Sequence, residues 1–370
     1  ITSEKNIVWV TGSIKKKGKY TTAIYQAEFK NDKLINSNNL QVDKKMKNLY
    51  KFFKDSEKIL DIKDYNKKLL KIFSWKVLEM IKNGDGVFMR IKIEPLSDAL
   101  GAKVTNLNLE KEILEADLVL LNQAFLKYHL LCVESNPLSS SSFLKFAAIF
   151  GEPQMQLLRH RWDGEKPEVS ILESTYKTPD SKPKDLNMVR LSGWHTDDSY
   201  FEVPAKATVL QALAIPSSGG QTRFSNTRKA FEEMPETVKS NIVKLVAVHS
   251  YDTIRANARA QKLTTEETNE TKDVEHPLVR THEDTSLKSI YFNPNRTDRI
   301  VGMSRNESDN LLDVIYAWVT KEEFQYHHEW RLGDILLWDN RCLLHSVNVD
   351  YPIGEIRKHQ RILLKGTRPV

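Results

Sequence analysis

Two short stretches decide the fold: WHTD at residues 194–197 and WDNRCLLH at residues 338–345. In an extended strand, residues i and i+2 face the same way, so His195 and Asp197 present an imidazole and a carboxylate to one point. His345 lies on an apolar strand and offers a third ligand. Two histidines and one carboxylate that leave coordination positions open are typical of a non-haem iron site.

Each stretch has a plainer interpretation when it is taken alone. The chain has ten histidines, so a His-x-Asp pattern arises easily by chance, and a histidine on an apolar strand is more often a core residue than a ligand. We interpret the adjacent His327 and His328 as one inward-facing and one outward-facing residue of a strand. Three further histidines we interpret as structural: His249, His276 and His282.

The surrounding spacing favours the metal site. Arg357 and Arg361 lie four residues apart on one predicted strand and therefore share a face. Upstream, a Gly-Gly turn within residues 216–222 delivers the hydroxyl of Thr222. An arginine forms a bidentate pair with a carboxylate, and a hydroxyl fixes the orientation of that carboxylate. These residues therefore suit a dicarboxylate, and either arginine can supply the cation.

From about residue 91 to residue 370 the chain resembles the TauD/TfdA-like (taurine dioxygenase) family of Fe(II)- and 2-oxoglutarate-dependent dioxygenases. The resemblance implies an α+β fold whose core is a double-stranded β-helix, or jelly roll, with flanking helices. It also implies Fe(II), 2-oxoglutarate and O2 as cofactors and co-substrates. The matching segments are residues 95–102, 146–151, 194–197, 216–222, 276–282, 299–301 and 338–345, followed by the arginine pair.

Carried over residue by residue, the resemblance assigns the catalytic metal to His195, Asp197 and His345. It assigns the far carboxylate of 2-oxoglutarate to Thr222 and Arg357. The resemblance implies that Arg361 meets the acidic group of the primary substrate. Three more residues are substrate-side candidates: His160 as a loose match to a sulfonate-binding histidine, Asp198 as a solvated charge or an ammonium receptor, and Tyr200 as a pocket wall.

The implied reaction is oxidation, by default hydroxylation, of a small anionic substrate such as a sulfonate, a carboxylate or an amino-acid derivative, with release of succinate and CO2. An alternative within the family is a biosynthetic oxidase that desaturates or cyclises an amino-acid-derived precursor. An alternative of another class is a dioxygenase that modifies a macromolecule recruited by a basic N-terminal segment. A loop over residues 175–190, rich in Lys, Asp and Pro, is expected to form a lid or pocket wall.

The charge distribution predicts a domain boundary. Residues 1–86 contain 19 lysines, no arginine and 10 acidic residues, whereas the rest of the chain has a net charge of −3. We therefore expect a Lys-rich N-terminal extension over 1–86 and a dioxygenase domain over 87–370. Alternation and apolar spacing predict that the extension is a small α+β unit with strands at 7–11 and 20–29 and helices at 49–60 and 65–81.

In the larger domain, periodicity predicts helices over 112–128, 139–150 and 307–320 and strands over 130–133, 333–338, 343–347 and 357–366. The apolar runs are too short to span a bilayer, and no secretory leader opens the chain. Two cysteines cannot make a disulfide framework, so a reducing, cytoplasmic location is expected. The expected partner is a small anionic molecule rather than a membrane or a nucleic acid, and the sequence allows a homo-oligomer.

Overall fold

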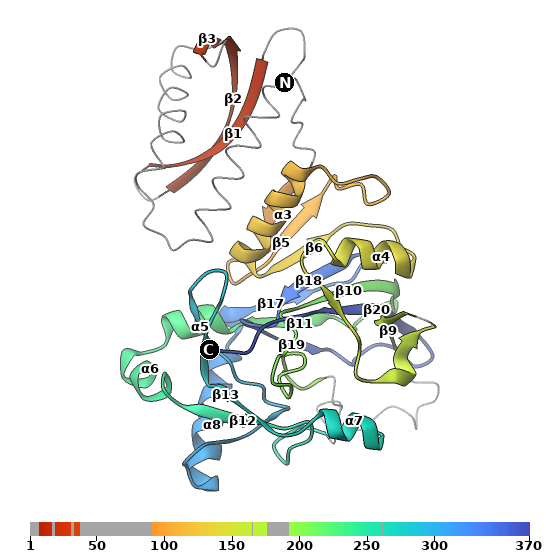
Figure 1. Ribbon diagram of the computed structural model, residues 1–370, viewed down its shortest axis with the longest axis vertical. Helices are drawn as coiled ribbons and strands as arrows, with labels where there is room; N and C mark the ends of the chain where they lie inside the picture. Colours follow the sequence, from red (N-terminus) through yellow and green to blue (C-terminus); the bar gives the residue numbers. More distant parts are fainter. Residues whose placement is uncertain are drawn as a thin grey trace. The chain divides into compact units, whose positions relative to one another are not determined.

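The computed structural model describes residues 7–16, 19–30, 33–37, 91–164, 166–175, 192–258, 260 and 262–370. The chain divides into two compact units, one of residues 1–90 with 114–119 and one of residues 91–113 with 120–370. In the first, three antiparallel strands form a sheet: β1 (Ile7–Lys16), β2 (Lys19–Lys30) and β3 (Lys33–Ser37) (Figure 1). Both strands predicted here are present. The helices predicted at 49–60 and 65–81 lie outside the described residues.

One large sheet dominates the second unit. Its strands run in the order β4-β5-β6-β18-β10-β20-β9-β8, and β7 pairs with β20 beside this path (Figure 1). All neighbours are antiparallel except β5 and β6. The strands are β4 (Lys92–Pro95), β5 (Ala102–Thr105), β6 (Leu130–Val133), β7 (Pro153–Gln154), β8 (Trp162–Asp163), β9 (Lys166–Thr175), β10 (Ala207–Ala214), β18 (Ile335–Asp339) and β20 (Ile356–Leu364).

A three-stranded sheet in the order β17-β11-β19 packs against the large one. Its strands are β11 (Thr222–Asn226), β17 (Gln325–His328) and β19 (Leu343–Val347). Phe224 and Leu343 from this sheet share a core with Leu336 and Trp338 from β18, so the two sheets enclose a common interior. Two facing sheets with helices on the outer side confirm the predicted α+β fold with a jelly-roll core.

Strand alternation separates the interior between the sheets from the outer face of the large sheet. On β18, Leu336 and Trp338 point inward, while Ile335 and Leu337 join a core with the helices that cover the outer face. These helices are α3 (Glu115–Tyr128) and α4 (Ser140–Ala147), the latter capped by Ser139. The same alternation on β20 sends Ile362 to the helices. The odd-numbered positions 357, 359 and 361 therefore face the interior.

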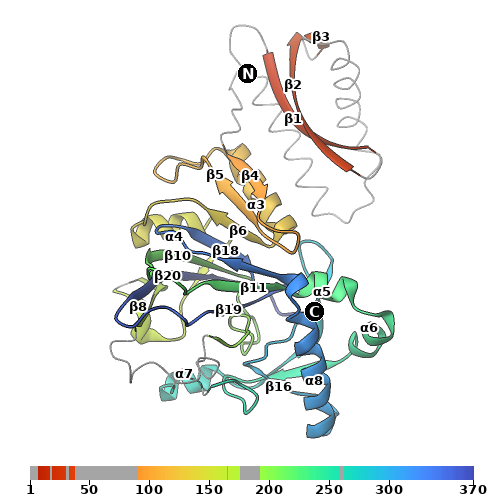
Figure 2. The ribbon, with the colours of Figure 1, turned by 180° about the vertical axis from the view of Figure 1, so that it is seen from behind.

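Smaller elements surround a second hydrophobic core, which is separate from the interior between the two sheets. They include two short sheets, in the order β13-β12-β16 and as the pair β14-β15, and helix α8 lies beside β16 (Figure 2). The elements are β12 (Val246–His249), β13 (Val274–Pro277), β14 (Val279–Thr281), β15 (Lys288–Ile290), β16 (Thr297–Ile300), α5 (Thr227–Glu233), α6 (Glu236–Ile242), α7 (Thr265–Glu270) and α8 (Arg305–Val319).

The predicted elements of this unit are present, with ends displaced by a few residues. The strands at 130–133 and 343–347 match in full, and the helix predicted to start at Glu307 begins at Arg305 because Ser304 and Glu307 form a capping box. His327 is exposed and His328 is buried, as expected of strand neighbours. The loop predicted as a lid lies outside the described residues, apart from Thr175. In the described part of the chain, no helix combines the length and apolarity that a bilayer span requires.

Gly333, in the turn that leads into β18, offers a direct test of this packing. Its φ is +89°, and a Cβ built there lies 2.1 Å from the carbonyl oxygen of Ser135. We expect Gly333→Ala to lower the free energy of unfolding by about 3 kcal/mol, because alanine is strained at this φ and the backbone around Ser135 must also move to make room for the Cβ. Gly302 has a φ of +80° with nothing within 4 Å of the added Cβ, so Gly302→Ala should cost only about 1 kcal/mol. Thermal unfolding of both variants measures the difference, and equal losses would contradict the described turn.

Candidate active site

The structure brings His195, Asp197 and His345 to one point. His195 forms an isolated antiparallel bridge with His345 of β19, in which the two backbone N–H groups donate to the opposite carbonyl oxygens at 2.9 and 2.7 Å. Their ring centroids are 4.1 Å apart, and Nε2 of His345 is 3.8 Å from Oδ2 of Asp197. One ligand atom from each of the three residues lies within 4.8 Å of the others. This spacing suits three ligands on one face of a divalent cation.

The protonation states of these side chains also suit a metal. The Nδ1 atom of His195 is 2.9 Å from the carbonyl oxygen of Gly193, which only accepts, so Nδ1 carries the hydrogen and Nε2 keeps its lone pair. Burial, with a contribution from His195, lowers the pKa of His345 to about 3. Burial alone would raise the pKa of Asp197, but His345, Arg361, His195 and the Thr208 hydroxyl hold it at about 2. At neutral pH the site therefore offers neutral imidazole and ionised carboxylate.

A short chain of hydrogen bonds orients the Asp197 carboxylate. The hydroxyl of Thr208, on β10, donates to Oδ2 of Asp197 at 2.6 Å. Asn340 Nδ2 donates to that hydroxyl at 2.8 Å, and Trp338 Nε1 donates to Asn340 Oδ1 at 2.9 Å. The large sheet thus fixes the carboxylate, whereas the small sheet carries His345. Sequence reasoning missed Thr208, because only the pairing of β10 with β18 reveals its place.

Thr222 and Arg357 form a socket for an acid. Arg357, on β20, donates through Nε to the carbonyl of Gly220 at 3.0 Å and through Nη2 to the Thr222 hydroxyl oxygen at 3.1 Å. Trp330 Nε1 donates to the same oxygen at 3.0 Å. With two donors on its oxygen, the Thr222 hydroxyl has its hydrogen left to give, and no described residue accepts it. We call Thr222, Arg357 and Trp330 the acid socket.

The electrostatics of the acid socket favour an anion. Arg357 is buried, and burial lowers its pKa to about 10, which shows that its positive charge is poorly solvated. No carboxylate among the described residues forms an ion pair with it. A buried cation is stable when it meets a counter-charge, so the acid socket is suited to a ligand carboxylate.

Arg361 lies on the same face of β20 but contacts other residues than Arg357 does. Its Nη1 is 3.5 Å from Oδ1 of Asp197, and its Nη2 donates to Gln156 Oε1 at 3.0 Å. Its buried Nε has no hydrogen-bond partner among the described residues. The two arginines therefore have different neighbours: Arg357 contacts Thr222, and Arg361 borders the carboxylate of Asp197.

Two of the three remaining candidates adjoin this centre. Asp198 was expected to be a solvated charge or an ammonium receptor, but it is half-buried with a φ of +56°. Its carboxylate accepts hydrogen bonds from Gln154 at 2.7 Å and from the Tyr200 hydroxyl at 3.0 Å, so the solvated orientation is not observed. Burial and the neighbouring Asp197 raise its pKa to about 6. The third candidate, His160, is exposed and lines a shallow surface depression with residues 159 and 264–267.

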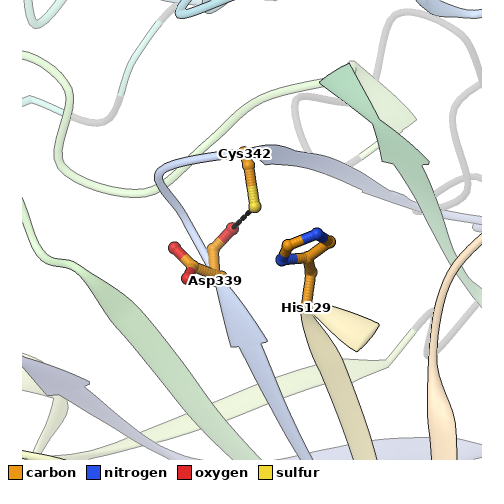
Figure 3. A group of neighbouring side chains, drawn as sticks. All are labelled: His129, Asp339 and Cys342. Atoms are coloured by element: carbon orange, nitrogen blue, oxygen red, sulfur yellow. Dashed lines mark hydrogen bonds between the residues drawn. The ribbon is translucent and has the colours of Figure 1, made fainter. Parts of the chain in front are cut away.

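Within the described residues, two other buried groups have the composition of a metal site. In the first, drawn in Figure 3, the Asp339 carboxylate already accepts hydrogen bonds from His282 and Arg341. The Nε2 atom of His129 accepts from Arg228 at 3.0 Å, and Cys342 donates to the backbone oxygen of Asp339. Arg341 thus balances the charge of the Asp339 carboxylate, and the hydrogen bond from Arg228 occupies the lone pair of the His129 imidazole. This group is a structural network rather than a metal centre.

The second group is Cys132, His328 and Asp334. Burial raises the pKa of the Cys132 thiol to about 12, with a further contribution from Asp334, so the thiol keeps its proton. The His328 ring lies between the Tyr326 hydroxyl, 3.1 Å from Nδ1, and Asp334 Oδ2, 3.4 Å from Nε2. The protonated thiol and the contact between the His328 ring and the Tyr326 hydroxyl argue against a metal here, which leaves His195, Asp197 and His345 as the candidate metal site.

Comparison with known proteins agrees with this geometry. Residues 92–364 match the family model described as taurine catabolism dioxygenase TauD, TfdA family. The chain is 28% identical over 289 residues to an alkylsulfatase of Acinetobacter baylyi, covering 75% of this chain and 86% of the relative. It is 30% identical over 284 residues to an (S)-phenoxypropionate/alpha-ketoglutarate-dioxygenase of Sphingobium herbicidovorans, covering 73% and 94%.

A solved structure with a bound metal and a dicarboxylate has a similar fold. The crystal structure of AAD-2 in complex with Mn(II) and N-oxalylglycine superposes with a TM-score of 0.62 at 27% identity, covering 76% of this chain and 99% of that one. The family match covers well over half of the sequence. The described site also offers the side-chain types that suit a ferrous ion and a dicarboxylate. The chain therefore belongs to the TauD/TfdA family and is an Fe(II)- and 2-oxoglutarate-dependent dioxygenase.

Proposed function

We propose that His195, Asp197 and His345 hold the ferrous ion and that Thr222 and Arg357 anchor the far carboxylate of 2-oxoglutarate. The observation that carries this assignment is the convergence of three metal-ligating atoms within 4.8 Å of one another. The acid socket supports the second half, because the buried guanidinium of Arg357 forms no ion pair with a carboxylate among the described residues. The family match over 92–364 supports a dioxygenase domain at 87–370, with residues 1–86 as a separate extension.

Arg361 is the residue proposed to receive the acidic group of the primary substrate. This role is supported by its position beside Asp197 and by its buried Nε, which has no hydrogen-bond partner among the described residues. The relatives named for phenoxypropionate and for alkyl sulfates act on small organic anions, which supports a sulfonate, sulfate ester or carboxylate here. Tyr200 and Asp198, which are joined by a hydrogen bond beside Asp197, are proposed to form a wall of the substrate pocket. The role of His160 in binding the substrate stays a prediction.

The chemistry belongs to the bound group, and the protein supplies geometry and charge. When bound, Fe(II), 2-oxoglutarate and O2 couple decarboxylation of the keto acid to succinate and CO2 with oxidation of the substrate. Thr208 and Asn340 hold Asp197 so that its carboxylate stays ionised and oriented. Arg357 fixes one end of the co-substrate, and Arg361 fixes the substrate anion, so the reacting carbon is positioned without freedom to rotate.

Hydroxylation is the proposed outcome because it is the default reaction that membership of the family implies. Desaturation or oxidative cyclisation uses the same residues with another substrate pose, and product mass separates them: hydroxylation adds one oxygen, whereas the others remove two hydrogens. A cytoplasmic location is proposed because both cysteines, Cys132 and Cys342, are buried free thiols.

Removing a metal ligand tests the site directly. Anaerobic titration of the protein with Fe(II) and 2-oxoglutarate should give the charge-transfer absorption of the chelate. We expect His345→Gln to lose this absorption and to weaken metal binding by roughly 100-fold or more, since even residues that only orient ligands cost about 10- to 100-fold. His327→Gln, which changes an exposed histidine on β17, is the control and should behave as wild type. Full retention of the absorption in His345→Gln would refute the metal assignment.

The division between the two arginines gives a second test. We expect Arg357→Gln to weaken 2-oxoglutarate binding by roughly 100-fold, because loss of a buried charge pair costs about 3 kcal/mol. Arg361→Gln should leave 2-oxoglutarate binding close to wild type and raise the substrate KM by a similar factor. Equilibrium titration of the co-substrate and steady-state kinetics on a panel of small sulfonates, sulfate esters and carboxylates measure the two effects. The reverse pattern would show that the roles are exchanged.

A further inference from the structure

His359 lies on β20 between the two arginines and faces the same interior. It is two residues from Arg357 and two from Arg361, and alternate strand residues share a face. Its side chain is fully buried. The residues directly opposite it are Ala212 on β10 and Leu172 on β9, and neither has a polar side chain.

Both ring nitrogens of His359 lack a hydrogen-bond partner among the described residues. Burial, with contributions from Arg357 and His328, lowers the pKa of the ring well below its usual value, so the imidazole is neutral. A neutral imidazole carries one N–H donor and one acceptor nitrogen. Leaving a buried donor or acceptor unsatisfied costs about 1–3 kcal/mol. Such a group is expected to meet a ligand or an ordered water.

The surroundings of His359 lead to the acid socket. Its ring packs edge-to-face against Trp330, with the ring centroids 4.5 Å apart. Trp330 and Arg357 both donate to the hydroxyl oxygen of Thr222. His359 therefore touches one member of the socket and shares a strand face with another. A dicarboxylate held by Thr222 and Arg357 has a second oxygen that can accept a further donor.

We propose that His359 is a third binding residue for the far carboxylate of 2-oxoglutarate, to which it donates a ring N–H beside Thr222 and Arg357. This inference rests on the function proposed for the acid socket. A neutral donor suits the position because a second cation next to the buried Arg357 would be repelled. His359 thereby adds a hydrogen bond without adding charge, and the co-substrate satisfies a donor that the protein leaves open.

A pair of ligands isolates the far carboxylate. 2-Oxopentanoate has the carbon chain of 2-oxoglutarate but ends in a methyl group, so it keeps the metal-chelating end and lacks the acid that His359 would bind. Equilibrium binding of both to the anaerobic Fe(II) protein gives two dissociation constants. The variants are His359→Met, whose flexible apolar side chain fills the space, and His359→Gln, which keeps an N–H donor.

We expect His359→Met to weaken 2-oxoglutarate binding by roughly 10- to 100-fold, as for loss of a hydrogen bond to a charged group. Its affinity for 2-oxopentanoate should not change, and His359→Gln should recover most of the affinity for 2-oxoglutarate. The matched control is His249→Met, which changes an equally buried histidine on β12 and should affect neither ligand.

The outcomes separate this inference from the proposed function. Equal weakening of both ligands in His359→Met, or no weakening of either, would overturn the role of His359 and leave a packing residue or one that bonds only to water. If the wild type binds both ligands equally, the assignment of the far carboxylate to the acid socket is wrong. Should the Met variant not fold, ring-nitrogen NMR of histidine in the Zn(II)-loaded wild type is decisive. One histidine beyond the metal ligands should respond to 2-oxoglutarate but not to 2-oxopentanoate, and no such response would refute the proposal.

Discussion

The site depends on the backbone bridge between His195 and His345. Two reciprocal N–H to carbonyl hydrogen bonds tie the segment that carries His-x-Asp to β19 of the small sheet. Once this register is fixed, the turn that follows His195 brings Oδ2 of Asp197 to 3.8 Å from Nε2 of His345. Loss of the bridge would separate the ligands even if every side chain were retained. The tight approach of the histidine rings, 4.1 Å between centroids, follows from it.

The large sheet supplies the two arginines that border the candidate site. β20 presents Arg357, His359 and Arg361 to the interior, while its alternate residues pack under the helices. Each inward residue has a hydrogen-bonding capacity that the described protein does not fully use. Burying such groups without partners is costly, and ligands with acidic ends recover that cost. The buried charge and the unsatisfied donors on β20 therefore favour anionic ligands in general.

Much of this arrangement was predictable from the sequence, for identifiable reasons. Short apolar runs predicted the strands at 130–133 and 343–347, and the His-x-Asp pattern predicted that His195 and Asp197 share a site, although Asp197 lies in a turn rather than in a strand. Contacts between distant strands could not be predicted in this way. Thr208 reaches Asp197 only because β10 pairs with β18, and Asp198 turns inward because its φ is positive. Local pattern also gave no signal for His359, whose significance comes from unsatisfied nitrogens beside Trp330.

The central claim is that one ferrous ion and one dicarboxylate occupy the space between the bridge and β20. A crystal structure of the protein with Mn(II) and N-oxalylglycine tests it most directly. The account predicts a metal about 2.0–2.2 Å from ligand atoms of His195, Asp197 and His345. It also predicts the far carboxylate of the analogue against Thr222 and Arg357. A metal bound elsewhere, or that carboxylate on Arg361, would contradict the account.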